Sequence, residues 1–155
     1  MREGTDGVAT TLRFTGKTLV LDGRSRKFEY PAASGKTGRY APIPAGRYWI
    51  ATDQVYELGP GTDYVAKTLA AILTLSSRSR VEDRHHASWG RYRIPIHQSA
   101  EQQRRTGRSG LFIHGGSAFG SAGCIDLAEW IDVFVDHLRA ECPGGERREI
   151  PLLVD

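Results

Sequence analysis

Apolar and polar residues alternate along the first third of the chain in four short runs, at 11–14, 18–21, 27–30 and 47–52. A period of two is typical of strands that bury one face, and Gly16 and Asp22-Gly23 mark turns between the runs. The pattern predicts a half-buried antiparallel meander. The segment 30–46 is rich in Pro and Gly and is predicted to be a loop.

A helical pattern dominates the last third of the chain. Apolar residues recur there with a 3.6-residue period, at Trp130, Ile131, Phe134, Val135 and Leu138. Asp126 and Glu129 fit a D-x-x-E capping arrangement, and Pro143 with the two glycines after it ends the pattern. We therefore expect a helix from Asp126 to about Ala140.

The middle of the chain has weaker patterns. Apolar spacing favours a helix over 62–73, with a strand through "ILTL" (72–75) as the alternative, and the polar stretch 76–86 is predicted to be solvated. Strands are expected within 89–97, 110–114 and 150–154, and an Arg-containing connection at 101–110. Together the elements predict a single β-rich α+β domain over residues 1–155.

Composition agrees with one domain. The chain has 155 residues, of which 39% are hydrophobic, and a single domain commonly has about 100 to 200 residues. No run approaches the roughly 18 apolar residues of a transmembrane helix, so we expect a protein that is not embedded in a membrane. The polar start, Met1 to Asp6, lacks the apolar segment of a secretory signal.

Charge and cysteine content narrow the function classes. The net charge of +3 is spread along the chain without a basic block, which does not indicate nucleic-acid binding. Most basic residues are Arg, which suits carboxylate recognition but also follows from base composition. Two cysteines are too few for a disulfide scaffold. The predicted helix holds Cys124 and Cys142 about 20 Å apart, so they are expected to stay unpaired.

The segment "GLFIHGGSAFGSAGCIDL" (110–127) contains the candidate chemistry. It places His114 at the end of a predicted strand and Cys124 just before the predicted helix, where a helix N-terminus stabilises thiolate. His114 is then the candidate base for a Cys124 nucleophile. Backbone N–H groups around Gly123 are candidate oxyanion donors, and Gly115 and Gly116 allow close approach of the backbone.

Less specific explanations exist for each of these residues. A lone Cys is commonly a small buried apolar residue and a lone His a satisfied polar one, but the surrounding glycines favour the catalytic pairing. His85, His86 and His97 lack the spacing of metal ligands, so neither a metal nor another cofactor is expected. Ser34 and Lys36 are assigned to a turn.

The same segment resembles the active-site stretch of L,D-transpeptidase-like catalytic domains. "FIHGG" followed by "GSAGCIDL" is most similar to the branch with a shorter His-to-Cys spacing, found among type VI secretion effectors that attack peptidoglycan. The stretches "YPAASGK" (30–36), "PIPAGRYWI" (42–50) and "WGRYRIPI" (89–96) are also similar to this branch. The resemblance spans most of the chain.

The resemblance implies Cys124 as nucleophile and His114 as base, with support from Ser121, Gly123, Gly115 and Gly116. It implies an attack on the diaminopimelate–D-alanine bond of peptidoglycan tetrapeptide stems. The outcome would be L,D-carboxypeptidase cleavage when water accepts the acyl group, or D-amino-acid exchange and transpeptidation when an amine does.

Two positions depart from the housekeeping enzymes of the family, which have His where Ala122 stands and Arg where Asp126 stands. Without that Arg, another residue must anchor the substrate carboxylates. The candidates for substrate binding are Arg91, Arg104, Arg108, Tyr92 and Trp89, with Arg93 and Arg105 as further cations.

The effector resemblance also implies partners and a location. A cognate immunity protein and a component of a secretion machine or an adaptor are the expected partners. The protein would be made in the cytoplasm without a signal peptide and act in the periplasm of target bacteria. A housekeeping L,D-transpeptidase that forms wall cross-links and a non-catalytic wall-binding domain remain the alternatives.

Overall fold

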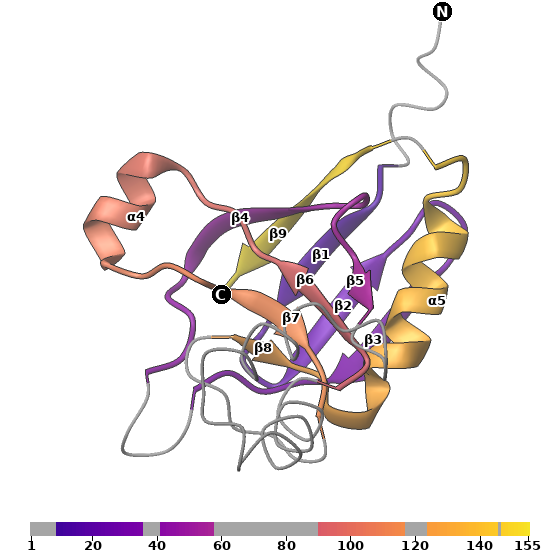
Figure 1. Ribbon diagram of the computed structural model, residues 1–155, viewed down its shortest axis with the longest axis horizontal. Helices are drawn as coiled ribbons and strands as arrows, with labels where there is room; N and C mark the ends of the chain where they lie inside the picture. The colour runs from indigo at the N-terminus through magenta and orange to yellow at the C-terminus, as the bar shows by residue number, and fades with distance from the viewer. Residues whose placement is uncertain (1–8, 36–40, 58–89, 117–123, 146) are drawn as a thin grey trace, which may run out of the picture.

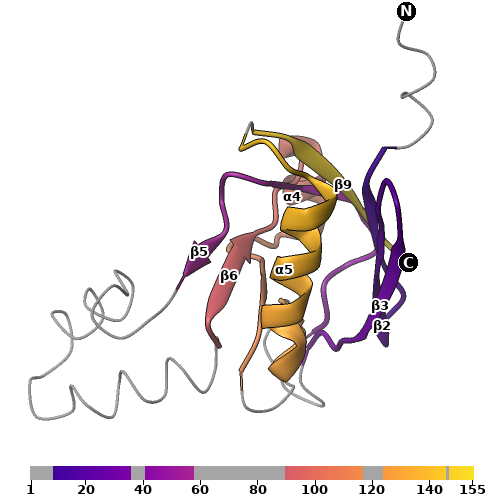
Figure 2. The same cartoon turned by 90° about the vertical axis from the view of Figure 1, so that its right-hand side faces the viewer.

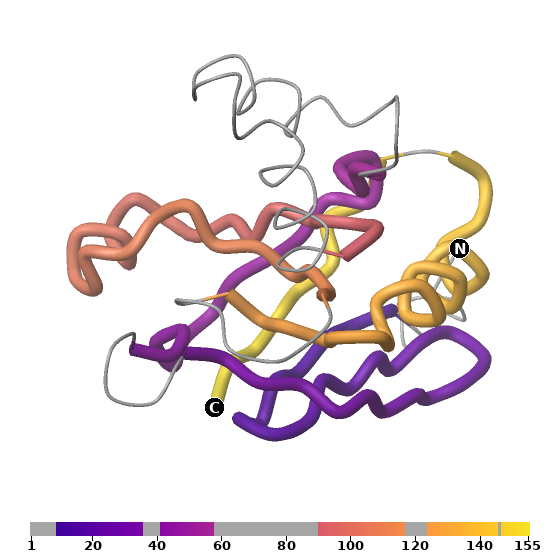
Figure 3. Tube along the Cα trace, turned by 60° about the horizontal axis from the view of Figure 1, so that its bottom comes forward, coloured from indigo at the N-terminus to yellow at the C-terminus, as the bar shows by residue number. Residues whose placement is uncertain are grey.

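Two β-sheets and one main helix build the part of the chain described by this computed structural model, residues 9–35, 41–57, 90–116, 124–145 and 147–155. The main helix is α5 (Ile131–Glu141), and a shorter helix, α4 (Ala100–Thr106), lies at the opposite end of the molecule (Figures 1 and 3). The protein is therefore β-rich α+β, as the sequence predicts.

The larger sheet has five strands in the order β3-β2-β1-β9-β4. Its members are β1 (Thr11–Phe14), β2 (Thr18–Asp22), β3 (Lys27–Pro31), β4 (Gly46–Ala51) and β9 (Glu149–Val154). The predicted meander is confirmed for β1, β2 and β3, which pair antiparallel. It is wrong for β4, because the C-terminal strand β9 lies between β1 and β4, parallel to β1 and antiparallel to β4.

The smaller sheet has four strands in the order β5-β6-β7-β8. They are β5 (Tyr56–Glu57), β6 (Tyr92–Pro95), β7 (Phe112–His114) and β8 (Ile125–Asp126). All pairs are antiparallel except β7 with β8. Two isolated bridges connect the sheets: Ala33, just after β3, pairs with Asp126 of β8, and Trp49 of β4 pairs with His97, just after β6.

The core lies between the two sheets, and α5 packs along the side where they diverge (Figure 2). Alternate strand residues point inward, which gives the burial pattern of β1 and β9 its period of two. The apolar face of α5 completes the core with Ile131, Phe134, Val135 and Leu138, as predicted. Trp130 was predicted on the same face but is 41% exposed, because it lies in the short helix before α5.

The start of the main helix differs from the prediction. Ile125 and Asp126 form β8, a 3₁₀ helix (η2) follows over Ala128–Trp130, and α5 begins only at Ile131. The Asp126 carboxylate accepts a hydrogen bond from the Ala128 N–H at 2.8 Å, which closes a tight turn in place of a helix cap. Ala128 adopts a left-handed φ of 49° in this turn. Pairing of β8 with β7 therefore outweighs the local capping pattern.

Helix α4 replaces the connection expected at 101–110. Its N-cap Ser99 accepts from the Gln102 N–H at 3.1 Å, and Gly107 ends it in the left-handed conformation. The helix has no apolar face: Gln102 is its buried residue, and the Gln102 amide hydrogen bonds both the N–H and the carbonyl of Arg47. Periodicity therefore gave no signal, although the S-x-x-Q sequence and Gly107 mark both ends.

Several predicted elements fall outside the described residues. These are the helix at 62–73, the solvated stretch at 76–86 and the middle of the Pro- and Gly-rich loop. Of the turn residues assigned from sequence, Ser34 accepts a hydrogen bond from the Ile43 N–H at 2.8 Å. In the ranges that the structure describes, no helix has the length and apolar character needed to cross a membrane.

Candidate active site

His114 ends strand β7, and Cys124 directly precedes the neighbouring parallel strand β8. In the β7·β8 pair Ile113 is opposite Ile125 and His114 is opposite Asp126. Ile113 and Ile125 are fully buried, and His114 and Asp126 alternate with them along the two strands. Cys124 therefore lies next to β8, two residues before the strand partner of His114.

The His114 ring is held by the backbone of the next residue. Its Nδ1 lies 2.7 Å from the Gly115 carbonyl oxygen, which can only accept, so Nδ1 carries the proton and donates. Burial lowers the pKa of His114, and the hydrogen bond to Gly115 opposes that effect only in part. The imidazole is therefore neutral at pH 7, with Nε2 as its proton acceptor.

A glycine is required at position 115 because the end of β7 packs directly on the start of the main helix. A Cβ atom there would collide with the Ile131 side chain and the Ala128 carbonyl oxygen. The Leu127 N–H also donates to the His114 carbonyl at 2.8 Å. The Gly115 carbonyl holds the His114 ring, and a role of Gly115 in supporting an oxyanion stays a prediction. Gly116 follows at φ 146°, where the chain leaves the strand.

Cys124 is a buried thiol, 5% exposed. We expected a helix N-terminus to lower the pKa of Cys124, but β8 and η2 separate it from α5. Burial raises the pKa of Cys124 instead, and the negative charge of Asp126 adds to this effect. A hydrogen bond from the Phe112 backbone and the positive charge of Arg108 act in the opposite direction. The resting form is a neutral thiol. Cys124 and Cys142 are both free, as predicted.

Asp126 lies beside His114, although the sequence predicted a different role for it. It was expected to cap a helix, yet it lies opposite His114 with 1% exposure. On the other side of His114, Arg93 of β6 is its antiparallel partner. Arg93, His114 and Asp126 thus form a row across three strands on one face. Only the strand pairing, which no local pattern encodes, brings them together.

Among the arginines nominated from sequence, Arg108 is the one placed near the thiol. Its charge acts on Cys124, and its guanidinium donates to the carbonyl oxygens of Ala41 and Pro42 at 3.0 and 3.1 Å. Arg91 is instead paired with Glu57 at 3.1 Å, at the edge formed by β5 and β6. Arg104 is exposed on α4.

The remaining nominated residues lie elsewhere or outside the described part. Tyr92 points into the core, 4% exposed, because it alternates with Arg93 along β6. Trp89, Ser121 and Gly123 are not among the residues that the structure describes. His97 lies 2.5 Å, Nε2 to Oε1, from Gln54 and stacks on Trp49. Within the described ranges, no three His, Cys, Asp or Glu side chains are grouped as metal ligands would be.

Comparison with known proteins supports the fold and nothing finer. No family model and no curated protein matches the sequence. Among solved structures, that of Bd1075 from Bdellovibrio bacteriovorus aligns with a TM-score of 0.55 and 18% identity. The alignment covers 97% of this chain and 49% of that chain, so this chain spans about half the length of Bd1075. At this identity the two proteins share a fold, and the likeness carries no information on activity.

Proposed function

We propose that this protein is a cysteine-dependent enzyme that modifies peptidoglycan at the diaminopimelate–D-alanine bond of tetrapeptide stems. The observation that carries the proposal is the position of His114 at the end of β7 and of Cys124 directly before the paired strand β8, with Nδ1 of His114 bound to the Gly115 carbonyl. That tautomer leaves Nε2 as the acceptor for the thiol proton, which is the arrangement nucleophilic catalysis by Cys requires. The family resemblance supplies the substrate.

The first half-reaction begins with a neutral pair. The Cys124 proton moves to Nε2 of His114 while the sulfur attacks the diaminopimelate carbonyl carbon. As the tetrahedral intermediate collapses, the C–N bond breaks, the nitrogen takes the proton from His114, and D-alanine leaves. A thioester between Cys124 and the stem remains. Because burial lowers the pKa of His114 and the imidazole must start neutral, we expect the fall in kcat/KM at a pH below the ordinary His pKa of about 6.5.

The second half-reaction depends on the acceptor. Water that loses a proton to His114 hydrolyses the thioester, which gives net L,D-carboxypeptidase cleavage and restores the thiol. A D-amino acid or the side-chain amine of another stem would give exchange or a cross-link by the same route. Arg93 and Arg108 are the cations best placed to bind the substrate carboxylates, since Arg93 is opposite His114 and the charge of Arg108 reaches Cys124.

The direct test is release of D-alanine from purified tetrapeptide muropeptides. Cys124→Ala should abolish release, whereas Cys142→Ala, which removes the other thiol of the chain, should leave it nearly unchanged. Cys124→Ser is a second variant with nearly the same volume. If Cys124→Ala still releases D-alanine, the assignment fails. Identification of the products separates hydrolysis from exchange and transpeptidation.

For the biological role we propose an antibacterial effector, with a cognate immunity protein and a secretion-machine component or adaptor as partners. Expression directed to the periplasm of a Gram-negative test strain should be toxic, and expression in the cytoplasm harmless. Toxicity must disappear with Cys124→Ala. Harmless periplasmic expression with new cross-links would favour a housekeeping L,D-transpeptidase. Wall binding unchanged by Cys124→Ala, with no activity, would favour a non-catalytic domain.

A further inference from the structure

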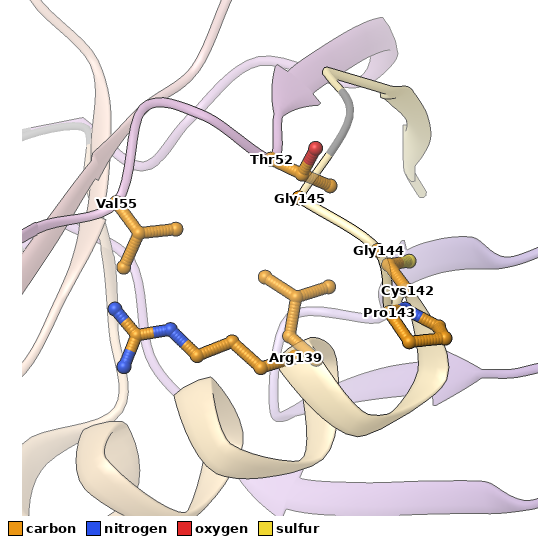
Figure 4. A pocket seen from close by; sticks show the side chains of 8 residues that line it. Thr52, Val55, Arg139, Cys142, Pro143, Gly144 and Gly145 are labelled. Carbon is orange, nitrogen blue, oxygen red and sulfur yellow. The ribbon is translucent and has the colours of Figure 1, made fainter.

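A hollow lies at the C-terminal end of α5, away from His114. It has a volume of about 310 Å³ and is lined by Thr52, Val55, Leu138, Arg139, Cys142, Pro143, Gly144 and Gly145. Figure 4 shows Arg139 reaching toward Val55 on one side of the space, with Cys142 on the other. The α5 helix of 11 residues, at about 1.5 Å per residue, separates this hollow from the start of the helix by roughly 16 Å.

Arg139 brings a positive charge to the hollow. Among the described residues, no Asp or Glu lies within ion-pair distance of Arg139. Its guanidinium carbon lies 5.3 Å from the centroid of the Tyr92 ring, so the side chain rests on an aromatic face. A guanidinium held in this way presents its N–H groups to a planar anion, and a carboxylate is the anion that such a fork fits best.

The other walls supply two more features of a ligand site. Gly144 and Gly145 both have left-handed φ values, 103° and 74°, and their N–H groups make no hydrogen bond to another described residue. Consecutive N–H groups of this kind favour an anion. Leu138 is 1% exposed and Val55 packs against the core, so they form an apolar floor and wall.

We propose that this hollow binds a small carboxylate with a short apolar body, such as the free C-terminus of a peptide that ends in a small apolar residue. The carboxylate would bind the Arg139 guanidinium and the Gly144 and Gly145 N–H groups, and the apolar part would contact Val55 and Leu138. Peptide C-termini are captured by backbone N–H groups in other recognition sites. This inference is independent of the reaction proposed at Cys124.

Size sets the class of ligand. At about 30 Å³ per water molecule, the hollow holds about ten water volumes, at the lower end of the range of roughly 300 to 1,000 Å³ for ligand pockets. A single acylated amino acid fits this volume. N-acetylvaline is a suitable probe because it has one carboxylate and a branched apolar side chain, and N-acetylvalinamide is the matched neutral compound.

Cys142 offers a direct readout because it lines the hollow. In a Cys124→Ala background it is the one remaining thiol of the chain, and catalysis at position 124 is absent. The rate of alkylation by neutral iodoacetamide should fall to a plateau as N-acetylvaline is added. N-acetylvalinamide should protect far less. With Arg139→Gln added, the N-acetylvaline concentration giving half-protection should rise about tenfold or more.

Three comparisons decide the outcome. Arg26→Gln, which removes the same charge from an exposed turn residue, should leave protection intact, and Arg139→Lys should restore it in part. Equal unfolding midpoints for all variants show that the fold is retained. Equal protection by the amide, protection that survives Arg139→Gln, or alkylation that N-acetylvaline never slows would each overturn the proposal. None of these outcomes bears on D-alanine release by the wild-type enzyme.

Discussion

The two ends of α5 differ in how closely the chain packs around them. At the N-terminal end, Gly115 contacts Ile131 and the Ala128 carbonyl so closely that no side chain fits at position 115. At the C-terminal end, the Cys142 N–H closes the helix on the Leu138 carbonyl, and the exposed residues 143–145 border an open hollow. Close packing suits the end that fixes an imidazole, and open space suits the end that would accept a ligand.

The two thiols of the chain differ in burial in the same way as the two ends of α5. Cys124, beside β7, is buried and has a raised pKa. Cys142, at the end of α5, is half-buried and lines the hollow there. The thiol proposed as nucleophile is therefore the less accessible one. The difference teaches that the proposal for Cys124 rests on the proton acceptor at the end of the neighbouring strand and not on exposure of the thiol.

Removal of the imidazole should have the largest effect. His114→Gln is expected to reduce kcat/KM for D-alanine release by about 10² to 10⁴, because the thiol loses its general base. His97→Gln is the matched control, since His97 lies just after strand β6 and contacts Gln54 and Trp49. A similar loss in both variants would mean that the effect comes from the fold and not from proton transfer.

The close contact at position 115 should give the next largest effect. Gly115→Ala forces a Cβ against Ile131 and the Ala128 carbonyl, and overpacking of this kind costs about 1 to 3 kcal/mol. Gly16→Ala, at a left-handed turn residue with no atom within 4 Å of the new Cβ, tests backbone strain without collision and should cost about 1 kcal/mol. Urea unfolding measures both, and a smaller loss for Gly115→Ala would refute tight packing at this end.

Alkylation at neutral pH should be faster at Cys142 than at Cys124, since the thiolate is the reacting form and burial both raises the pKa of Cys124 and shields its sulfur. The raised pKa of Cys124 also means that its alkylation accelerates above the ordinary range for a thiol. Peptide mass spectrometry after brief iodoacetamide treatment gives both rates. Faster labelling of Cys124 at pH 7 would contradict the neutral, buried resting state.

The smallest effect concerns a contact at the far end of α5. The Glu141 carboxylate accepts from the Ser25 N–H at 2.8 Å and the Ser25 hydroxyl at 2.7 Å, and these bonds lower its pKa. Glu141→Gln should cost about 1 kcal/mol at pH 7. A lowered pKa means that this stabilisation is present above about pH 4.5, the ordinary value, and is lost as the pH falls further.

Urea unfolding at pH 7 and at pH 3 checks both the size and the sign of this effect. The exposed Glu129 provides the control, because Glu129→Gln removes the same charge from a side chain that has no hydrogen-bond partner among the described residues. The difference between wild type and Glu141→Gln should shrink at pH 3. A difference that stays constant, or equal losses in the two variants, would show that the contact with Ser25 contributes nothing measurable.

Local patterns predicted the elements whose burial repeats regularly. The alternation in β1, β2 and β3, the strand before His114 and the buried face of α5 were all present in the sequence. Helix α4 was missed because its buried side chain is a glutamine, although its caps were visible. Asp126 was assigned to the start of a helix because its sequence context imitates a cap, and it lies in β8 and pairs with β7 instead.

The sequence by itself determined the fold class and the two reactive residue types, because both depend on residue identity and short-range spacing. Only the tertiary structure decided which groups meet. The parallel pairing of β7 with β8 places Asp126 opposite His114 and brings Cys124, the residue before β8, to the neighbouring strand, and the Gly115 carbonyl holds the imidazole. It also decided the sign of the Cys124 pKa shift, because burial depends on distant segments and the expected helix terminus is elsewhere.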